Sequence, residues 1–178
     1  MELWKITLAA GMLAATSLTA PALAGGVLRL DEVAVGELDP AKASDYADSI
    51  LMFNIYDTLV LPVQGGPGHA PHLAESWSKD GNTFTFNLRT DVNFQSGNPM
   101  TAEDVVFSVE RMKELGAGLS YLLGVVDSVE AVDASTVRFT LSSPYAPFVA
   151  SLVRLPIIDK QLVMANLGEG EGDMGGWG

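Results

Sequence analysis

The chain has 178 residues and a formal net charge of −12, with 22 acidic and 10 basic side chains. This length suits one domain of ordinary size, and so acidic a chain without a basic cluster excludes nucleic acid and anionic lipid surfaces as expected partners. The sequence contains no cysteine, which excludes disulfides, thiol nucleophiles, cysteine-based zinc sites and a lipid-modified cysteine.

The first 24 residues have the pattern of an export signal. Lys5 precedes an apolar run of small residues, and Ala22-Leu23-Ala24 matches the A-x-A motif that signal peptidase accepts. The run is too short to span a bilayer of about 30 Å, and Pro21 would break a helix at that point. We therefore expect a signal peptide at residues 1–24, cleavage after Ala24 and a periplasmic chain with no direct membrane insertion after cleavage.

The mature chain is predicted to begin with a strand and continue into a helix. Residues 27–35 alternate in part and are rich in valine and leucine, which favours a strand, and Asp39-Pro40 then signals a turn. From Ser44 or Asp45 the pattern becomes helical, and either side chain could cap the helix. The positions that predict its packed face recur at helical spacing: Ala47, Ile50, Leu51, Asn54, Ile55 and Thr58.

The middle of the chain is predicted to be a loop followed by antiparallel strands. Residues 62–77 are rich in glycine and proline, which indicates a loop. Residues 83–88 alternate strictly after the turn dipeptide Asp80-Gly81. Residues 136–141 alternate in the same way and should pair with residues 125–132 as a hairpin. Trp77 should pack on Phe84 or Phe86, and residues 147–153 should form a short helix.

Glu103 and Asp104 admit two interpretations, a catalytic acid pair or the start of a helix. Thr101 is a good N-cap and Asp104 follows three residues later, as in a capping box. Negative charge in a first helical turn is also favoured by the helix dipole. Adjacent carboxylates on a helix point about 100° apart, so they cannot flank one substrate bond as glycosidase acids do. The helix is favoured, with an apolar stripe of Val105, Val106, Val109 and Met112.

In this order the motifs resemble a known family. The stretches that carry the resemblance are "LDPAKASDYADSILMFNIYDTLV", "PHLAESWSKDGNTFTFNLRTDVNFQSGNPMTAEDVVFSVERM" and "SVEAVDASTVRFTLSSPYAPFVASL". They are similar to the family 5 solute-binding proteins, the peptide-type periplasmic receptors of ABC importers. The likeness covers residues 27–152, with small departures such as Gln95-Ser96 where the family often has His-Asp.

The resemblance implies a mixed α/β (α+β) fold of the periplasmic-binding-protein type II kind, in which two lobes close on a ligand. It implies that residues 25–43 are the first segment of ligand-binding lobe I. Residues 44–167 would be a satellite domain of antiparallel strands and helices, and residues 168–178 a Gly-rich tail at a truncation point. Because family members are much longer, we expect an incomplete fold and an N-terminal fragment.

The implied function is a receptor that binds a peptide or other small solute and delivers it to the transmembrane subunits of an ABC permease. No enzymatic activity and no cofactor are implied. The family's ligand contacts come partly from the segment after Leu-Asp-Pro, which here corresponds to Ala43, Ser44, Asp45 and Tyr46. The alternative is that Ser44 and Asp45 only cap a helix and that Tyr46 belongs to the core.

Other readings of the sequence stay open but have less support. His69 and His72 lie in a predicted loop and make at best a partial metal site, so no metal is expected. The nucleophile-elbow and phosphate-loop motifs of enzymes are absent. The alternatives are a secreted hydrolase that uses acids such as Asp45 and Asp48, and a stand-alone interaction module or non-functional remnant.

Overall fold

The computed structural model describes residues 36–166; the predicted signal peptide, the strand at 27–35 and the Gly-rich tail lie outside this range. The elements are, in chain order, α1 (Tyr46–Ile55), β1 (Val60–Pro62), β2 (His69–Pro71), β3 (Ala74–Asp80), β4 (Thr83–Leu88), α2 (Ala102–Leu115), η1 (Ser120–Leu123), β5 (Val126–Asp133), β6 (Thr136–Leu141), α3 (Phe148–Ser151), η2 (Leu152–Arg154) and α4 (Lys160–Ala165).

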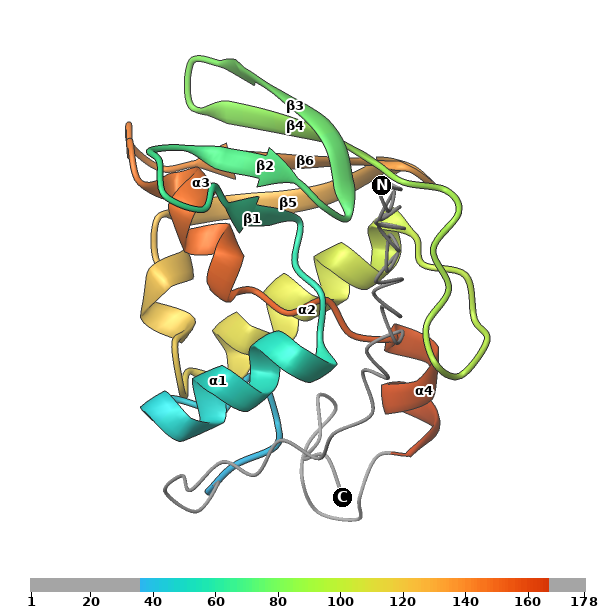
Figure 1. Cartoon of the computed structure of the whole chain (residues 1–178). Helices are drawn as coiled ribbons and strands as arrows, with labels where there is room; N and C mark the ends of the chain where they lie inside the picture. The colour runs from blue at the N-terminus through green and yellow to red at the C-terminus, as the bar shows by residue number, and fades with distance from the viewer. Residues whose placement is uncertain (1–35, 167–178) are drawn as a thin grey trace, which may run out of the picture. The chain divides into compact units, whose positions relative to one another are not determined.

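Two hairpins build a four-stranded antiparallel sheet in the order β3-β4-β6-β5 (Figure 1). The loop between β3 and β4 turns at Gly81, whose φ of 58° suits glycine. Alternate residues of β4 and β6 point into the core, because successive side chains of a strand face opposite sides of the sheet. Both predicted hairpin strands, at 83–88 and 136–141, are therefore confirmed.

The prediction of a continuous loop at 62–77 was wrong. β1 and β2 pair antiparallel as a small separate sheet, with Val60 opposite Pro71. The connection between them includes Gly65 and Gly68, both at positive φ. Strands of three residues are too short to display alternation, and the proline in each strand and the glycines between them hide both strands in the sequence. The same stretch also contains the start of β3.

The edge strands of the four-stranded sheet, β3 and β5, are both irregular. The pairing of β3 with β4 shifts register between Ala74 and Ser76. The pairing of β5 with β6 shifts twice, between Val126 and Ser128 and between Ala131 and Asp133. Such bulges bend an edge strand and interrupt its hydrogen-bond ladder.

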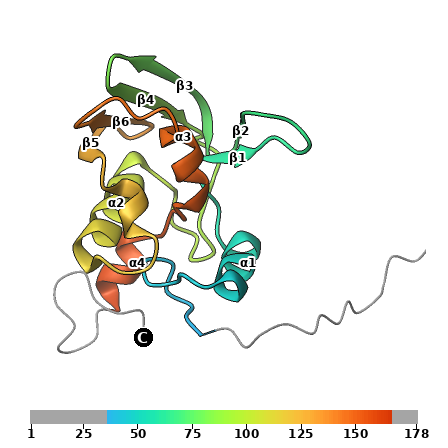
Figure 2. The ribbon, with the colours of Figure 1, turned by 90° about the vertical axis from the view of Figure 1, so that its left-hand side faces the viewer.

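α2 lies against one face of this sheet, as the two ribbon views agree (Figures 1 and 2). It begins with the predicted capping box, in which Asp104 Oδ2 accepts the Thr101 backbone N–H at 2.8 Å. Its core-facing side chains include Val105, Val109 and Met112, while Val106 is half-buried. Gly116 ends the helix at φ 58°, as expected for a left-handed C-terminal residue.

Aromatic side chains fill the space between the sheet and α3. Phe148 lies with its ring centroid 4.7 Å from that of Phe84 and 5.4 Å from that of Phe139. Trp77 stacks on Phe86, as predicted, with the two ring centroids 6.1 Å apart. Aromatic pairs at these separations add to the energy of burial, so the cluster fixes α3 and the segment that follows it.

α1 forms where it was predicted, but its packed face is only partly the predicted one. Of the predicted face, Ala47 is buried, but Ile55 is 45% exposed. Asp48 and Met52, which the pattern did not select, are buried as well. Asp48 is buried because its Oδ1 accepts the backbone N–H groups of Gly36 and Glu37 at 2.9 and 3.3 Å. Asp45 occupies the N-cap position without a side-chain capping bond. The helix is thus anchored by a polar contact to the segment before it.

Candidate functional site

The segment that precedes α1 is folded tightly around Asp39. The backbone oxygen of Asp39 accepts the N–H groups of Lys42 and Ala43 at 3.0 and 2.9 Å. Its carboxylate Oδ1 accepts the N–H of Ala41 at 3.0 Å. An aspartate carboxylate that accepts a hydrogen bond from the backbone N–H two residues later is typical of a turn. This turn leads directly into Ser44, the first exposed residue of the predicted ligand segment.

Asp39 is also one half of a buried ion pair with Arg111 on α2. The guanidinium donates to both carboxylate oxygens, at 2.7 and 2.6 Å, and the two side chains are 1% and 0% exposed. Burial alone would raise the pKa of Asp39, but the hydrogen bonds from Arg111 and Ala41, together with the charges of Arg111 and Lys42, outweigh it and lower that pKa. Burial and the nearby charge of Asp39 raise the pKa of Tyr56, against the opposing effect of Arg111.

The four predicted ligand residues differ in exposure. Ala43 is buried at 5% exposure, whereas Ser44 and Asp45 are exposed. Tyr46 is 77% exposed, so the alternative that it belongs to the core is wrong. Asp45 makes no side-chain capping bond, so it does not fill the capping role either. Three polar side chains therefore stand at the surface where α1 begins, and their contact with a ligand stays a prediction.

A groove runs past this end of α1. Ser44 and Tyr46 line one side of it, together with Ser49. The opposite side comes from η1, the segment before α3, and η2, through Tyr121, Leu122, Tyr145, Pro147 and Arg154 among others. The three tyrosines and one arginine are side chains that combine apolar surface with hydrogen-bonding groups. Such a surface can hold a small polar ligand and its apolar parts together.

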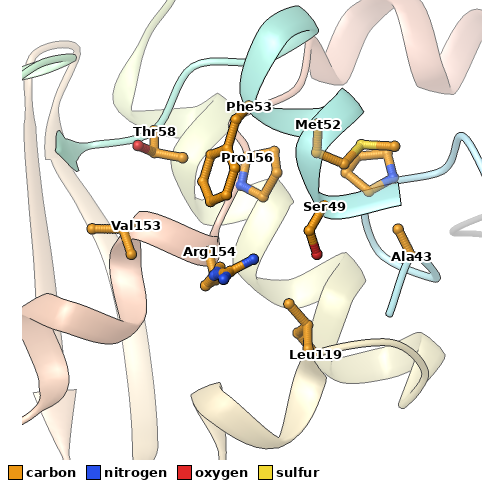
Figure 3. Close-up of a pocket in the computed structure, with 10 residues that line it drawn as sticks. Ala43, Ser49, Met52, Phe53, Thr58, Leu119, Val153, Arg154 and Pro156 are labelled. Atoms are coloured by element: carbon orange, nitrogen blue, oxygen red, sulfur yellow. The ribbon is translucent and has the colours of Figure 1, made fainter. Parts of the chain in front are cut away.

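A smaller hollow adjoins the groove and shares Ser49, Leu119, Val153 and Arg154 with it. Figure 3 shows Ser49 and Phe53 extending from α1 toward Arg154. The Arg154 guanidinium carbon lies 4.9 Å from the Phe53 ring centroid, a cation–π contact that orients the charge. Within residues 36–166, Arg154 is the one charged side chain that lines the groove and the hollow.

The sequence alone did not assign Arg154, Tyr121 or Tyr145 to a site. These residues lie far from Ser44 along the chain, and only the packing of η1 and η2 beside α1 brings them together. No local motif marks them. Their residue types, which are enriched at binding surfaces, were the only available signal.

Several other polar candidates have structural partners. Asp48 binds backbone N–H groups, as described above, and Glu103 forms a surface ion pair with Lys160 at 3.0 Å. His72 Nδ1 lies 3.0 Å from the Thr58 backbone oxygen, and its Nε2 lies 3.4 Å from Asp57 Oδ1. No group of three or more histidine, cysteine, aspartate or glutamate residues suited to a metal occurs between residues 36 and 166.

The sequence of this chain is similar to those of known bacterial binding proteins. The family model for bacterial extracellular solute-binding proteins, family 5 Middle, matches residues 69–174, which is more than half of the chain. A probable D,D-dipeptide-binding periplasmic protein of Escherichia coli, DdpA, is 37% identical over 121 residues, and the match spans 65% of this chain and 23% of that protein.

Solved structures agree with this match. The periplasmic binding protein DppA of Helicobacter pylori, in complex with the peptide STSA, has a TM-score of 0.62 and 36% identity over 71% of this chain and 29% of its own. MoaA of A. tumefaciens R10, in complex with mannopinic acid, has a TM-score of 0.65 and 35% identity over 72% of this chain and 28% of its own. The chain thus has the mixed α/β fold of type II periplasmic binding proteins, over part of their length.

No helix between residues 36 and 166 has the length and apolar character needed to cross a bilayer.

Proposed function

Because the chain belongs to the bacterial extracellular solute-binding proteins of family 5, we propose that it serves as a receptor component of an ABC importer. It binds a peptide or another small solute and passes it to the transmembrane subunits of the permease. The leader at residues 1–24 is removed after Ala24, which leaves the receptor in the periplasm. The observation that carries the proposal is the family match, together with relatives that are binding proteins and not enzymes.

The groove beside α1 is the proposed contact surface for the solute. Ser44 and Tyr46 supply hydrogen-bonding groups at its rim, and Arg154 supplies a positive charge. A peptide carries a carboxylate at one end, and arginine pairs with carboxylates through two parallel hydrogen bonds. The chain as a whole is strongly acidic, and the arginine offers an anionic group a local attraction within the groove.

Thermal unfolding with added solute tests this function. A ligand that binds the folded state at about 100 times its Kd stabilises it by about 2.7 kcal/mol. The relatives suggest the panel: the tetrapeptide STSA, and mannopinic acid as a non-peptide carboxylate. We expect at least one of the two to raise the unfolding temperature of the full chain.

A matched pair of variants locates the binding. Arg154→Gln should abolish the rise in unfolding temperature. Arg138→Gln should preserve it, because Arg138 lies in the sheet on β6 and pairs with Glu130 at 2.7 Å on the surface. If neither solute changes the unfolding temperature, the peptide-type assignment fails. If both variants lose the response equally, the groove is not the contact surface.

A further inference from the structure

The turn that presents Ser44 and Tyr46 is held at two points by residues that do not line the groove. At the first point, Arg111 donates two short hydrogen bonds to the Asp39 carboxylate. At the second point, the loop between α2 and η1 passes close to the turn backbone at Gly118. A Cβ at Gly118 would lie 2.8 Å from the Ala43 oxygen and 3.0 Å from the Ala41 oxygen. Both contacts reach the turn from the same part of the fold, α2 and the loop that follows it.

We propose that Asp39, Arg111 and Gly118 act as a clamp whose role is to position Ser44 and Tyr46 at the groove. The clamp residues are positioning residues, because the groove is lined by others. This inference rests on the proposed function insofar as the groove is a binding site, but the clamping of the turn can be measured without any ligand.

The ion pair sets the shape of the turn as well as its place. The Asp39 carboxylate that receives Arg111 also accepts the Ala41 N–H, while the Asp39 backbone oxygen accepts those of Lys42 and Ala43. Asp39 therefore links the Arg111 side chain on α2 to the backbone N–H groups of residues 41–43. Ser44 follows the last of them directly, so a shift at Asp39 is transmitted to the groove rim.

The backbone conformation and the close contacts at position 118 explain why this part of the clamp requires glycine. The φ of Gly118 is 53°, a conformation that residues with a Cβ adopt at a cost, and backbone atoms of the turn lie only 2.8 to 3.0 Å from its Cβ position. Backbone atoms cannot rotate away as a flexible side chain can. A side chain at this position must therefore push residues 41–43 away from the α2–η1 loop.

Gly116 offers a matched control in the same loop. It has a similar φ of 58°, but the nearest atom to its Cβ position is the Lys113 oxygen at 4.0 Å. Gly116→Ala therefore introduces the same backbone strain without touching the turn. The difference between Gly118→Ala and Gly116→Ala isolates the contact with residues 41–43.

Amide hydrogen exchange on the full chain tests the clamp. We expect Gly118→Ala to speed exchange at the Lys42 and Ala43 amides at least tenfold more than Gly116→Ala does, with the amides of β4 and β6 unchanged between the two. A merely structural role would speed exchange in the sheet as well, and equal exchange at the turn in the two glycine variants would overturn the clamp.

Binding of the tetrapeptide STSA gives the second readout. Where the wild-type chain binds STSA, Gly118→Ala should weaken the Kd at least tenfold relative to Gly116→Ala, and an unchanged Kd would overturn the positioning role. Where the wild-type chain responds to neither STSA nor mannopinic acid, the proposed function fails, and hydrogen exchange alone decides whether the turn is clamped.

Discussion

Breaking the Asp39–Arg111 pair should be among the most destabilising single changes in the described part of the chain. Asp39→Asn keeps the shape of the side chain and removes its charge. Arg111→Met keeps most of the aliphatic length and removes the guanidinium. Both side chains are fully buried, so either change removes one half of a short, bidentate ion pair from the interior.

The magnitude follows from that burial. Removing one partner of a buried pair typically costs about 3–5 kcal/mol of stability, while replacing both partners with well-packed uncharged groups can leave the stability almost unchanged. The single variants should therefore each lose about 3–5 kcal/mol, and the double variant should lose clearly less than the sum. Against a total stability of about 5–15 kcal/mol for a domain, each single loss is large.

Urea unfolding followed by far-UV circular dichroism measures these losses. With a slope of about 2 kcal/mol/M, each single variant should lower the midpoint by about 1.5–2.5 M. The control is the pair of Arg138 and Glu130, which is equally short at 2.7 Å but has side chains 42% and 58% exposed. An exposed pair contributes about 0–1 kcal/mol, so Arg138→Gln should shift the midpoint little.

Two results would contradict this prediction: equal losses for the buried and the exposed pair, or a double variant that loses the full sum of the single losses. The first result would mean that burial does not set the energy of the pair. The second would mean that the two residues stabilise the fold independently of each other.

Two further predictions concern the other acids. Asp104→Ala should cost about 1–3 kcal/mol of stability in the same urea assay, because Asp104 closes the capping box and its second oxygen accepts the Lys160 N–H at 3.0 Å. The control, Glu103→Ala, changes an exposed residue of the same turn and should alter stability by no more than about 0.5 kcal/mol. Equal losses in the two variants would contradict the capping role. Stability should also fall in acid: the pKa of Asp39 is lowered in the folded state from 3.8, so its contribution is complete above that value and is lost as the pH drops through the lowered folded pKa. Urea midpoints between pH 7 and pH 2.5 should therefore fall more steeply for the wild type than for the Asp39→Asn/Arg111→Met double variant, and parallel curves would contradict the assignment.

The elements that the sequence predicted well carry their signal locally. β4 and β6 alternate strictly because one face packs on the core, and α2 shows both a capping box and a helical stripe. Each pattern is complete within its own element, so no knowledge of the rest of the fold is needed to read it. The stacking of Trp77 on Phe86 was also predicted, although the sequence placed Trp77 in a loop and the structure places it on β3, opposite Phe86.

What the sequence could not predict depends on residues far apart in the chain. Asp39 and Arg111 are separated by 72 positions, and nothing in a single sequence says which of ten basic side chains meets a given acid. The packed face of α1 was misjudged for the same reason, since Asp48 is buried by backbone groups outside the helix. The groove likewise exists only once η1 and η2 lie beside Ser44 and Tyr46.

The irregular edges of the main sheet limit how this chain can meet other proteins. An exposed, regular edge strand is a template onto which a foreign strand can add. Here both edges are interrupted by register shifts, and β5 carries three acids, Asp127, Glu130 and Asp133. A partner strand would meet a broken hydrogen-bond ladder and, on β5, negative charge. Recognition through strand addition is thereby disfavoured, and productive encounters are directed to surfaces built from helices and loops.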